Sequence, residues 1–287
     1  MNNLRAYYQL TKPGIIRGNL LTATAGFLVA SGRHVDFLLL LETLAAIALI
    51  IASACMVNNC LDRNIDKVME RTRRRATVTG AVSVRRVLIV AAVLGLLGFL
   101  ILAVHTNWLT VAVGLVGYVD YIIFYGIAKR RSWTGTLVGS ISGSTPVVAG
   151  YTAVSGQFDG AALILFLILT FWQMPHFYAI ALRRLDEYKA AGIPVLPAVR
   201  GTRSTKLQIV AYISAFLVAV LALGLFGYAG PLYTIVMVAL AVGWLAIALN
   251  GWNRHDTKRW ATQVFLYSLI LLPAFLAVIL IDVLLAG

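Results

Sequence analysis

A polar segment follows an apolar run near the start of the chain and carries the residues best suited to chemistry. It reads NNCLDRNIDKVMERTRRR (58–75), and within it Asn58, Asp62 and Asp66 recur at every fourth position. On an α-helix each step of four residues turns by about 40° and rises by ~6 Å, so the three side chains form one stripe. Two carboxylates one turn apart repel each other unless a cation lies between them.

Magnesium is the cation that such a stripe would hold. Mg²⁺ prefers oxygen ligands and commonly binds through one or two carboxylates together with substrate phosphates. The alternative is that the carboxylates form helical ion pairs with basic neighbours on an exposed helix end. These neighbours are Arg63, Lys67 and Arg71. Spacing alone leaves both interpretations open.

Four arginines at the end of the same segment suit a diphosphate group. Arginine grips phosphate oxygens through paired hydrogen bonds, and the cluster consists of Arg71, Arg73, Arg74 and Arg75. The alternative is that they contact lipid headgroups and only orient the chain. We favour that alternative for Arg73 and Arg74, whereas residue type does not decide between the two for Arg71 and Arg75.

A second candidate region lies in the segment FWQMPHFYAIALRRLDEYKAAGIPVLP (171–197). His176, with Gln173 and Tyr178, places polar groups inside an apolar run, and ionisable groups there usually have a function. The alternative for His176 is a hydrogen bond inside the bundle. Asp186 and Glu187 follow, and an acidic site facing the first one would complete a two-sided clamp for a diphosphate.

The surrounding sequence places these residues in a membrane protein. The chain has 287 residues, of which 60% are hydrophobic, and its mean hydropathy is +0.87. A membrane-spanning helix needs about 20 mostly apolar residues, and nine runs meet this length approximately. They are 15–31, 37–60, 84–105, 108–128, 133–154, 161–182, 207–228, 231–252 and 262–285. We therefore predict an all-α bundle of nine transmembrane helices that forms one membrane-embedded domain, 1–287.

The basic residues lie on one side of this predicted topology. All of the 24 Lys and Arg residues except Arg33 fall in the N-terminal segment or in every second loop. By the positive-inside rule the N-terminus is cytoplasmic and the C-terminus lies outside. The net charge of +13 is thereby explained without a nucleic-acid partner. The long polar segments 61–83 and 183–206 are predicted to be cytoplasmic and to hold the site.

Several of these segments resemble a known family. The run NNCLDRNID, followed by MERTRRR, resembles the first aspartate-rich motif, N-x-x-x-D-x-x-x-D, of the UbiA-type intramembrane prenyltransferases. The runs TKPGIIRGNL, WQMPHFYAIA and AGIPVLPAV are similar to the haem branch of that family. The resemblance extends from about residue 7 to residue 260. It implies nine spans, a prenyl diphosphate substrate and Mg²⁺ as cofactor.

The resemblance also assigns residues to roles. Its metal and diphosphate ligands fall on Asn58, Asp62 and Asp66, its catalytic arginines fall on Arg71 and Arg75, and its second polar motif falls on His176, Arg184 and Glu187. That second motif is usually two Asp four apart, so Glu187 either helps to hold a second metal or orients basic side chains. A further basic role falls on Lys129, Arg130 or Arg131, because the spacing from Tyr125 is one residue shorter than usual.

The reaction that the resemblance implies is transfer of a farnesyl group from farnesyl diphosphate to the 2-vinyl group of haem B. Addition of water then gives haem O and diphosphate. His176 is expected to contact haem through its iron or a propionate. Two other interpretations are prenyl transfer to an aromatic quinone precursor and a membrane transporter. The expected location is the bacterial cytoplasmic (inner) membrane, with haem A synthase or a terminal oxidase assembly as candidate partners.

Overall fold

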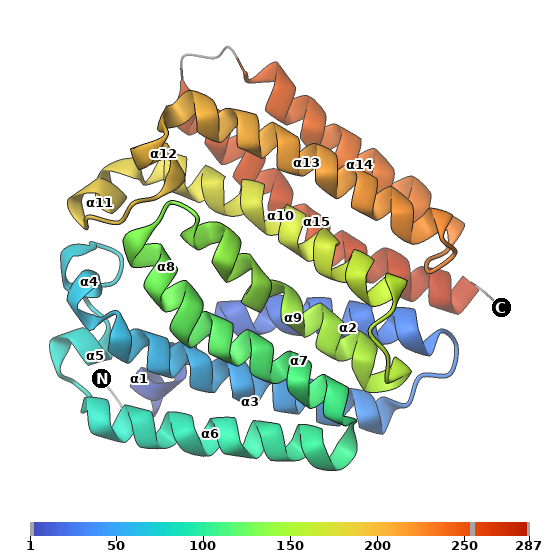
Figure 1. Cartoon of the computed structure of the whole chain (residues 1–287), viewed down its shortest axis with the longest axis horizontal. Helices are drawn as coiled ribbons and strands as arrows, with labels where there is room; N and C mark the ends of the chain where they lie inside the picture. The colour runs from blue at the N-terminus through green and yellow to red at the C-terminus, as the bar shows by residue number, and fades with distance from the viewer. Residues whose placement is uncertain (1–2, 253–255, 286–287) are drawn as a thin grey trace.

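The computed structural model describes residues 3–252 and 256–285, and all regular structure in these ranges is helical (Figure 1). Each of the nine predicted runs corresponds to a long helix. These are α2 (Pro13–Ser31), α3 (Phe37–Leu61), α6 (Val84–His105), α7 (Trp108–Val119) continued by η1 (Asp120–Phe124) and α8 (Tyr125–Arg131), α9 (Gly135–Ser155), α10 (Gly160–Arg183), α13 (Gly201–Leu225), α14 (Pro231–Asn250) and α15 (Thr257–Leu285). The all-α prediction is confirmed.

Seven helices in the described residues are long and apolar enough to cross a membrane. They include every long helix except α2 and α9, which contain many Gly, Ser and Thr residues. The total of nine spans and the orientation of the termini stay predictions.

The start of two helices differs from the hydropathy prediction by more than one turn. α13 begins at Gly201 instead of 207, and α15 begins at Thr257 instead of 262. The added turns contain charged residues, which lower hydropathy without preventing helix formation. One of them, Lys206, is buried and donates a hydrogen bond to the backbone oxygen of Trp252 at 3.0 Å.

Helices α2 and α9 pack closely against each other where they cross. A Cβ atom on Gly150 would stand 2.0 Å from the backbone oxygen of Ala23, and one on Gly26 would stand 2.0 Å from the oxygen of Val147. Small residues allow helix backbones in membranes to pack this closely. The α2–α9 pair is joined by α3, α7, α10 and α15, and the largest apolar cluster extends from α2 through α15.

The two polar segments predicted to hold the site contain short helices. α4 (Arg63–Val68) and α5 (Ala76–Thr79) lie in the first, and α11 (Leu185–Ala190) and α12 (Leu196–Val199) lie in the second. These four helices and α1 (Asn3–Leu10) all lie at the left end of the bundle in Figure 1. The chain thus brings both segments to one end of the molecule.

The continuous helix predicted for the polar stripe is interrupted at Asp62. α3 ends at Leu61 and α4 begins at Arg63, and Asp62 between them has φ −82° and ψ 0°. The backbone N–H of Asp62 still donates to the oxygen of Asn58, and that of Asp66 donates to the oxygen of Asp62, both at 2.9 Å. The spacing of four residues therefore survives the interruption.

Candidate active site

A cavity of about 740 Å³ lies inside the bundle, and most of the predicted site residues line it. Its walls come from α2, α3, α4, the α7–α8 helix, α9, α10 and α15. The predicted site residues that line it are Asn58, Asp62, Asp66, Arg71, Arg75, Lys129 and His176. Two regions that are far apart in the sequence therefore face one space.

Three predicted site residues do not line this cavity. Arg130 lies beside it, where its Nη2 atom donates to the Oδ1 atom of Asp62 at 3.0 Å. Arg184 and Glu187 form an ion pair with each other at 3.1 Å, and both side chains are partly exposed to solvent. Arg130 therefore reaches the site through Asp62, and the roles assigned to Arg184 and Glu187 stay predictions.

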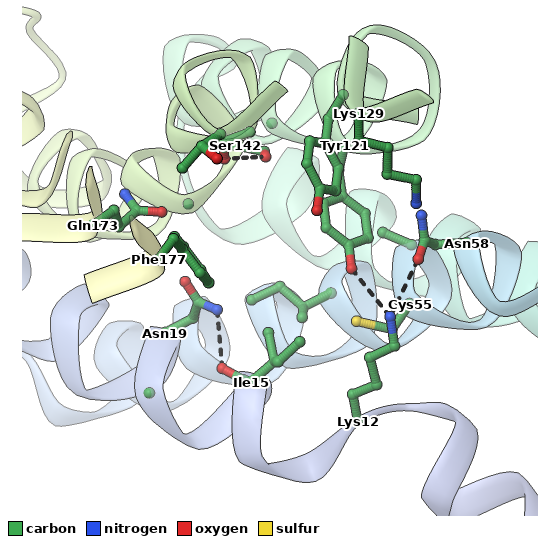
Figure 2. Close-up of a pocket in the computed structure, with 18 of the residues that line it drawn as sticks. Lys12, Ile15, Asn19, Cys55, Asn58, Tyr121, Lys129, Ser142, Gln173 and Phe177 are labelled. Atoms are coloured by element: carbon green, nitrogen blue, oxygen red, sulfur yellow. Dashed lines mark hydrogen bonds between the residues drawn. The ribbon is translucent and has the colours of Figure 1, made fainter. Parts of the chain in front are cut away.

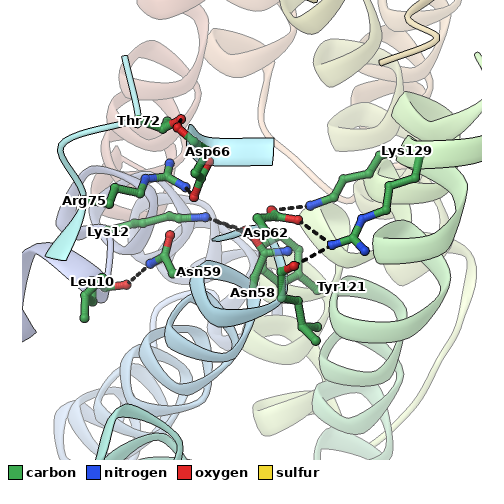
Figure 3. Close-up of polar contacts among 12 residues, drawn as sticks. Leu10, Lys12, Asn58, Asn59, Asp62, Asp66, Thr72, Arg75, Tyr121 and Lys129 are labelled. Atoms are coloured by element: carbon green, nitrogen blue, oxygen red, sulfur yellow. Dashed lines mark hydrogen bonds and ion pairs between the residues drawn. The ribbon is translucent and has the colours of Figure 1, made fainter. Parts of the chain in front are cut away.

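Both carboxylates of the stripe are buried and bind basic side chains from other elements (Figure 3). Asp62, 8% exposed, accepts from Lys129 and Arg130, and Asp66, 4% exposed, accepts from the Nη1 atom of Arg75 at 2.5 Å. A buried carboxylate without such a partner costs several kcal/mol. The alternative was that these carboxylates pair with Arg63, Lys67 and Arg71 along the helix. Among the described residues, neither Asp62 nor Asp66 forms an ion pair with any of these three.

Lys12, for which the sequence predicted no role, belongs to this cluster. Its Nζ atom donates to the amide oxygen of Asn58 at 3.2 Å and to the hydroxyl of Tyr121 at 3.3 Å. Burial of the ammonium group lowers the pKa of Lys12 from its ordinary value. The backbone is left-handed here, with φ 55°, a conformation that costs a non-glycine residue about 1 kcal/mol or more. The surrounding contacts must hold this conformation. The sequence signal for Lys12 is its place in the run TKPGIIRGNL, directly before the Pro that starts α2.

Two tyrosines cover part of the cavity wall beside Lys129. A π-helical turn, η1, interrupts the α7–α8 helix, and such turns often occur at functional sites. The rings of Tyr121 and Tyr125 stack with centroids 5.7 Å apart, and the Nζ atom of Lys129 lies 5.1 Å from the centroid of Tyr125. Asp120 in the same turn accepts from the backbone N–H of Ser142 at 3.1 Å, which is a structural contact. Aromatic faces of this kind can stabilise positive charge in the cavity.

The oxygen donors of the stripe fit Mg²⁺. The described residues contain no group of three or more His, Cys, Asp and Glu side chains that could hold a metal by themselves. Two carboxylates and the amide of Asn58 would leave positions for water and substrate phosphate, as Mg²⁺ usually requires. The Nδ2 atom of Asn58 is buried and has no hydrogen-bond partner in the described chain. A phosphate oxygen would satisfy this donor.

The polar end of the cavity has more basic than acidic groups. Lys12, Arg71, Arg75 and Lys129 line it, against Asp62 and Asp66. Tyr188 also lines this end, and burial raises the pKa of its hydroxyl, so the group stays a neutral hydrogen-bond donor. This excess of cations and donors suits an anion with several charges.

The opposite region of the cavity is aromatic and apolar. Figure 2 shows Gln173 and Phe177 across the cavity from Lys12, Asn58 and Lys129. His176 lies on this side and stacks on Trp172, with ring centroids 4.8 Å apart. The side-chain amide of Gln173 donates to the backbone oxygen of Leu169 at 3.0 Å, so Gln173 already has a partner within the bundle.

A membrane-spanning helical bundle with a cationic, carboxylate-containing end and an aromatic wall around one cavity defines a class of protein. The charge and apolarity of such a cavity match an apolar chain that carries an anionic head. Residues 19–270 match the UbiA prenyltransferase family, and the chain belongs to that family.

The relatives give a more particular similarity. The chain is 50% identical over 280 residues to Protoheme IX farnesyltransferase 2 of Pseudomonas aeruginosa. The matched region covers 97% of this chain and 95% of that protein. Among solved structures, one reported under a title on digeranylgeranylglyceryl phosphate synthase superposes on this chain with a TM-score of 0.82. The two chains are 15% identical, and the match covers 99% of each. A UbiA homologue from Archaeoglobus fulgidus bound to GPP and Mg²⁺ gives 0.73 at 16% identity, covering 96% of this chain and 99% of that one. These two structures support the fold.

Proposed function

We propose that this protein transfers the farnesyl group of farnesyl diphosphate to the 2-vinyl group of haem B and adds water, giving haem O and diphosphate. The observation that carries the proposal is the 50% identity, over 97% of the chain, to a protein named protoheme IX farnesyltransferase. The cavity supports it chemically, because one end suits a diphosphate and the other an aromatic macrocycle. No haem redox step is required.

The polar end of the cavity would bind the diphosphate. Lys12, Arg71 and Arg75 would donate hydrogen bonds to its oxygens, and the Nδ2 atom of Asn58 would gain an acceptor. Lys129 and Arg130 hold the carboxylate of Asp62 in place. Mg²⁺ held by Asn58, Asp62 and Asp66 would supply Lewis-acid stabilisation of the charge on the departing diphosphate.

The chemistry then consists of one ionisation and two additions. The C–O bond of the allylic diphosphate breaks, and its electron pair leaves with diphosphate. The π-electrons of the haem vinyl group form the new bond to the farnesyl carbon, which leaves a cation on the vinyl carbon next to the macrocycle. Water adds to that carbon and releases a proton. Preorganised donors around the leaving group stabilise this transition state more than the ground state.

The aromatic wall protects and stabilises the cation. The rings of Tyr121 and Tyr125 line the same cavity as the residues that would bind the diphosphate, and their faces can stabilise a cation. The apolar surroundings exclude bulk water, which would otherwise capture the farnesyl cation before the vinyl group does. His176 would contact the haem from the opposite side of the cavity.

The proposal includes a membrane topology. All nine long helices cross the bacterial inner membrane, the N-terminus is cytoplasmic, the C-terminus lies outside, and one domain covers the chain. The end of the bundle that holds α4, α5, α11 and α12 then faces the cytoplasm, where farnesyl diphosphate would enter. A haem A synthase or a terminal oxidase assembly would receive the haem O that this protein forms.

The test is a transfer assay with the purified chain in lipid nanodiscs. Farnesyl diphosphate, haem B and Mg²⁺ are supplied, and the extracted haems are separated by chromatography. The wild-type protein should form haem O, and Asp62→Asn should lower the rate by roughly 100-fold, because it removes a ligand charge from the site. Glu70→Gln is the matched control, since the side chain of Glu70 is 79% exposed on the same segment.

Other outcomes of this assay separate the competing functions. Full activity in Asp62→Asn would refute the assignment of the metal site. With an aromatic quinone precursor supplied beside haem B, farnesyl transfer to that precursor and no haem O would establish the alternative acceptor. In sealed liposomes, passage of a substrate across the membrane without any consumption of farnesyl diphosphate would indicate a transporter.

A further inference from the structure

The side chain of Ser268 on α15 makes two contacts that fix its hydrogen. Its Oγ atom lies 2.7 Å from the Nδ1 atom of His176 and 2.5 Å from the backbone oxygen of Phe265. A hydroxyl group has one hydrogen to donate, and a carbonyl oxygen can only accept. Two acceptors facing each other at 2.5 Å would repel, so the hydrogen of Ser268 points to Phe265.

This contact determines the tautomer of His176. The Oγ atom of Ser268 has only lone pairs left for His176, so the Nδ1 atom of the ring must carry a hydrogen and donate it. The neutral imidazole then has its lone pair on Nε2. A second nitrogen fixed in this way is the usual arrangement of histidines that bind a metal through Nε2.

Trp172 fixes the plane of the same ring. It lies one turn before His176 on α10, and its ring stacks on the imidazole at 4.8 Å. Its Nε1 atom donates to the backbone oxygen of Ser268 at 2.9 Å. Ser268 is fully buried, so one residue on α15 holds both aromatic side chains of α10.

Among the described residues the imidazole of His176 makes its hydrogen bond through Nδ1 alone, and His176 lines the cavity, so Nε2 is available to a bound molecule. Its ring neighbours are aromatic, with Phe265 at 5.0 Å and Phe177 at 5.2 Å. A neutral nitrogen with a lone pair can ligate iron, but it cannot donate a hydrogen bond to a carboxylate.

We propose that His176 ligates the haem iron of the acceptor through Nε2, and that Ser268 is a positioning residue that fixes the tautomer and direction of this ligand. The inference rests on the proposed function, because that function supplies haem as the acceptor. It selects the iron over a propionate as the group that His176 contacts. Ligation would hold the porphyrin against the side of the cavity formed by α10 and α15. The residues that would bind the diphosphate line the same cavity.

The experiment measures porphyrin binding separately from transfer. The full chain in lipid nanodiscs is titrated with ferric haem B and, in parallel, with iron-free protoporphyrin IX, and binding is followed by absorption and electron paramagnetic resonance spectra. Wild-type protein should give the spectra of imidazole-ligated iron. His176→Ala should lose them, and added free imidazole should restore them. Binding of the iron-free porphyrin should change little in this variant.

Ser268 is tested with a pair of variants. Ser268→Ala should weaken binding of ferric haem by roughly tenfold, the usual loss when the hydrogen-bond partner of a metal-ligating histidine is removed. Ser268→Thr keeps the hydroxyl and should restore most of the affinity. An equal loss of iron-free porphyrin in Ser268→Ala would overturn the positioning role, because it would indicate a collapsed pocket.

Matched variants separate this inference from the proposed function. His105→Ala should leave the spectra unchanged, because His105 lies outside the cavity and bonds Glu42 at 2.8 Å. Asp62→Asn should lower transfer by roughly 100-fold but keep the ligated-iron spectra, which would support ligation independently of turnover. Unchanged spectra in His176→Ala would overturn iron ligation even if the wild-type protein makes haem O. Ligated-iron spectra in a wild-type protein that makes no haem O would uphold ligation and refute the proposed function.

Discussion

The ammonium nitrogen of Lys12 lies 3.2 Å from the side-chain oxygen of Asn58, although the two residues are 46 positions apart in the chain. This contact joins the start of α2 to the first residue of the polar stripe (Figure 3). It places a cation beside the stripe in the wall of the same cavity. Lys12 is therefore a candidate for stabilising the leaving group.

Variants of Lys12 should change both the rate of transfer and its pH dependence. A hydrogen bond to a charged group contributes about 1.5–3 kcal/mol, so Lys12→Met should lower the turnover rate by roughly 10- to 100-fold. Because burial lowers the pKa of Lys12, its ammonium loses its proton at a lower pH than an exposed lysine does. Wild-type activity should fall as the pH rises through that lowered value, and Lys12→Arg should shift the fall to higher pH.

The pH dependence is measured as haem O formed per minute across the alkaline range. Lys67→Met is the control, because Lys67 is exposed and does not line the cavity. Identical alkaline profiles for the wild-type protein and Lys12→Arg would show that Lys12 does not act as a cation.

Arg75 and Arg74 are adjacent but should behave differently. Arg75 contacts Asp66 at 2.5 Å and lines the cavity, whereas Arg74 is exposed and does not line it. Arg75→Ala should raise the KM for farnesyl diphosphate by about tenfold or more and lower kcat, because it removes a donor and leaves Asp66 buried without its partner. Arg74→Ala should leave both constants within about twofold. Steady-state kinetics with varied farnesyl diphosphate decide this, and equal effects of the two changes would contradict the assignment.

Removal of divalent metal should abolish transfer reversibly. A chelator should stop haem O formation, and added Mg²⁺ should restore it, because the carboxylates of Asp62 and Asp66 line the same end of the cavity and would repel a diphosphate unless a divalent cation lay between them. Asn58→Ala should shift the Mg²⁺ concentration for half-maximal activity upward, and Asn58→Lys should abolish activity by placing a second ammonium beside Lys12. The exposed Asn64 supplies the control, Asn64→Ala. Full transfer in the presence of excess chelator would refute a metal-dependent reaction.

The proposed topology predicts which surface positions face each side of the membrane. In a background with Cys55 and Cys60 changed to Ala, Arg74→Cys should react with a membrane-impermeant maleimide only from the cytoplasmic side. Gln157→Cys, between α9 and α10, should react only from the outside, because an odd number of spans separates the two positions. Labelling of both positions from the same side would rule out the nine-span arrangement.

Local properties of the sequence predicted the helices and one part of the site. A helix that spans a membrane must satisfy its backbone hydrogen bonds internally, so a run of apolar residues is sufficient to identify it. The spacing of Asn58, Asp62 and Asp66 predicted a common face because the helical repeat is itself local. The interruption at Asp62 was not predicted, since hydropathy and spacing do not report a change in backbone angles at a single residue.

The tertiary structure decided the rest of the site. Lys12 meets Asn58 only because α2 packs beside α3, and Ser268 reaches His176 only because α15 packs on α10. The sequence by itself determined which segments are helical and which residues are chemically capable, because those properties depend on neighbours a few positions away. Only packing decided which of these residues share one cavity, because their partners lie as many as 109 positions away along the chain, as Lys12 and Tyr121 do.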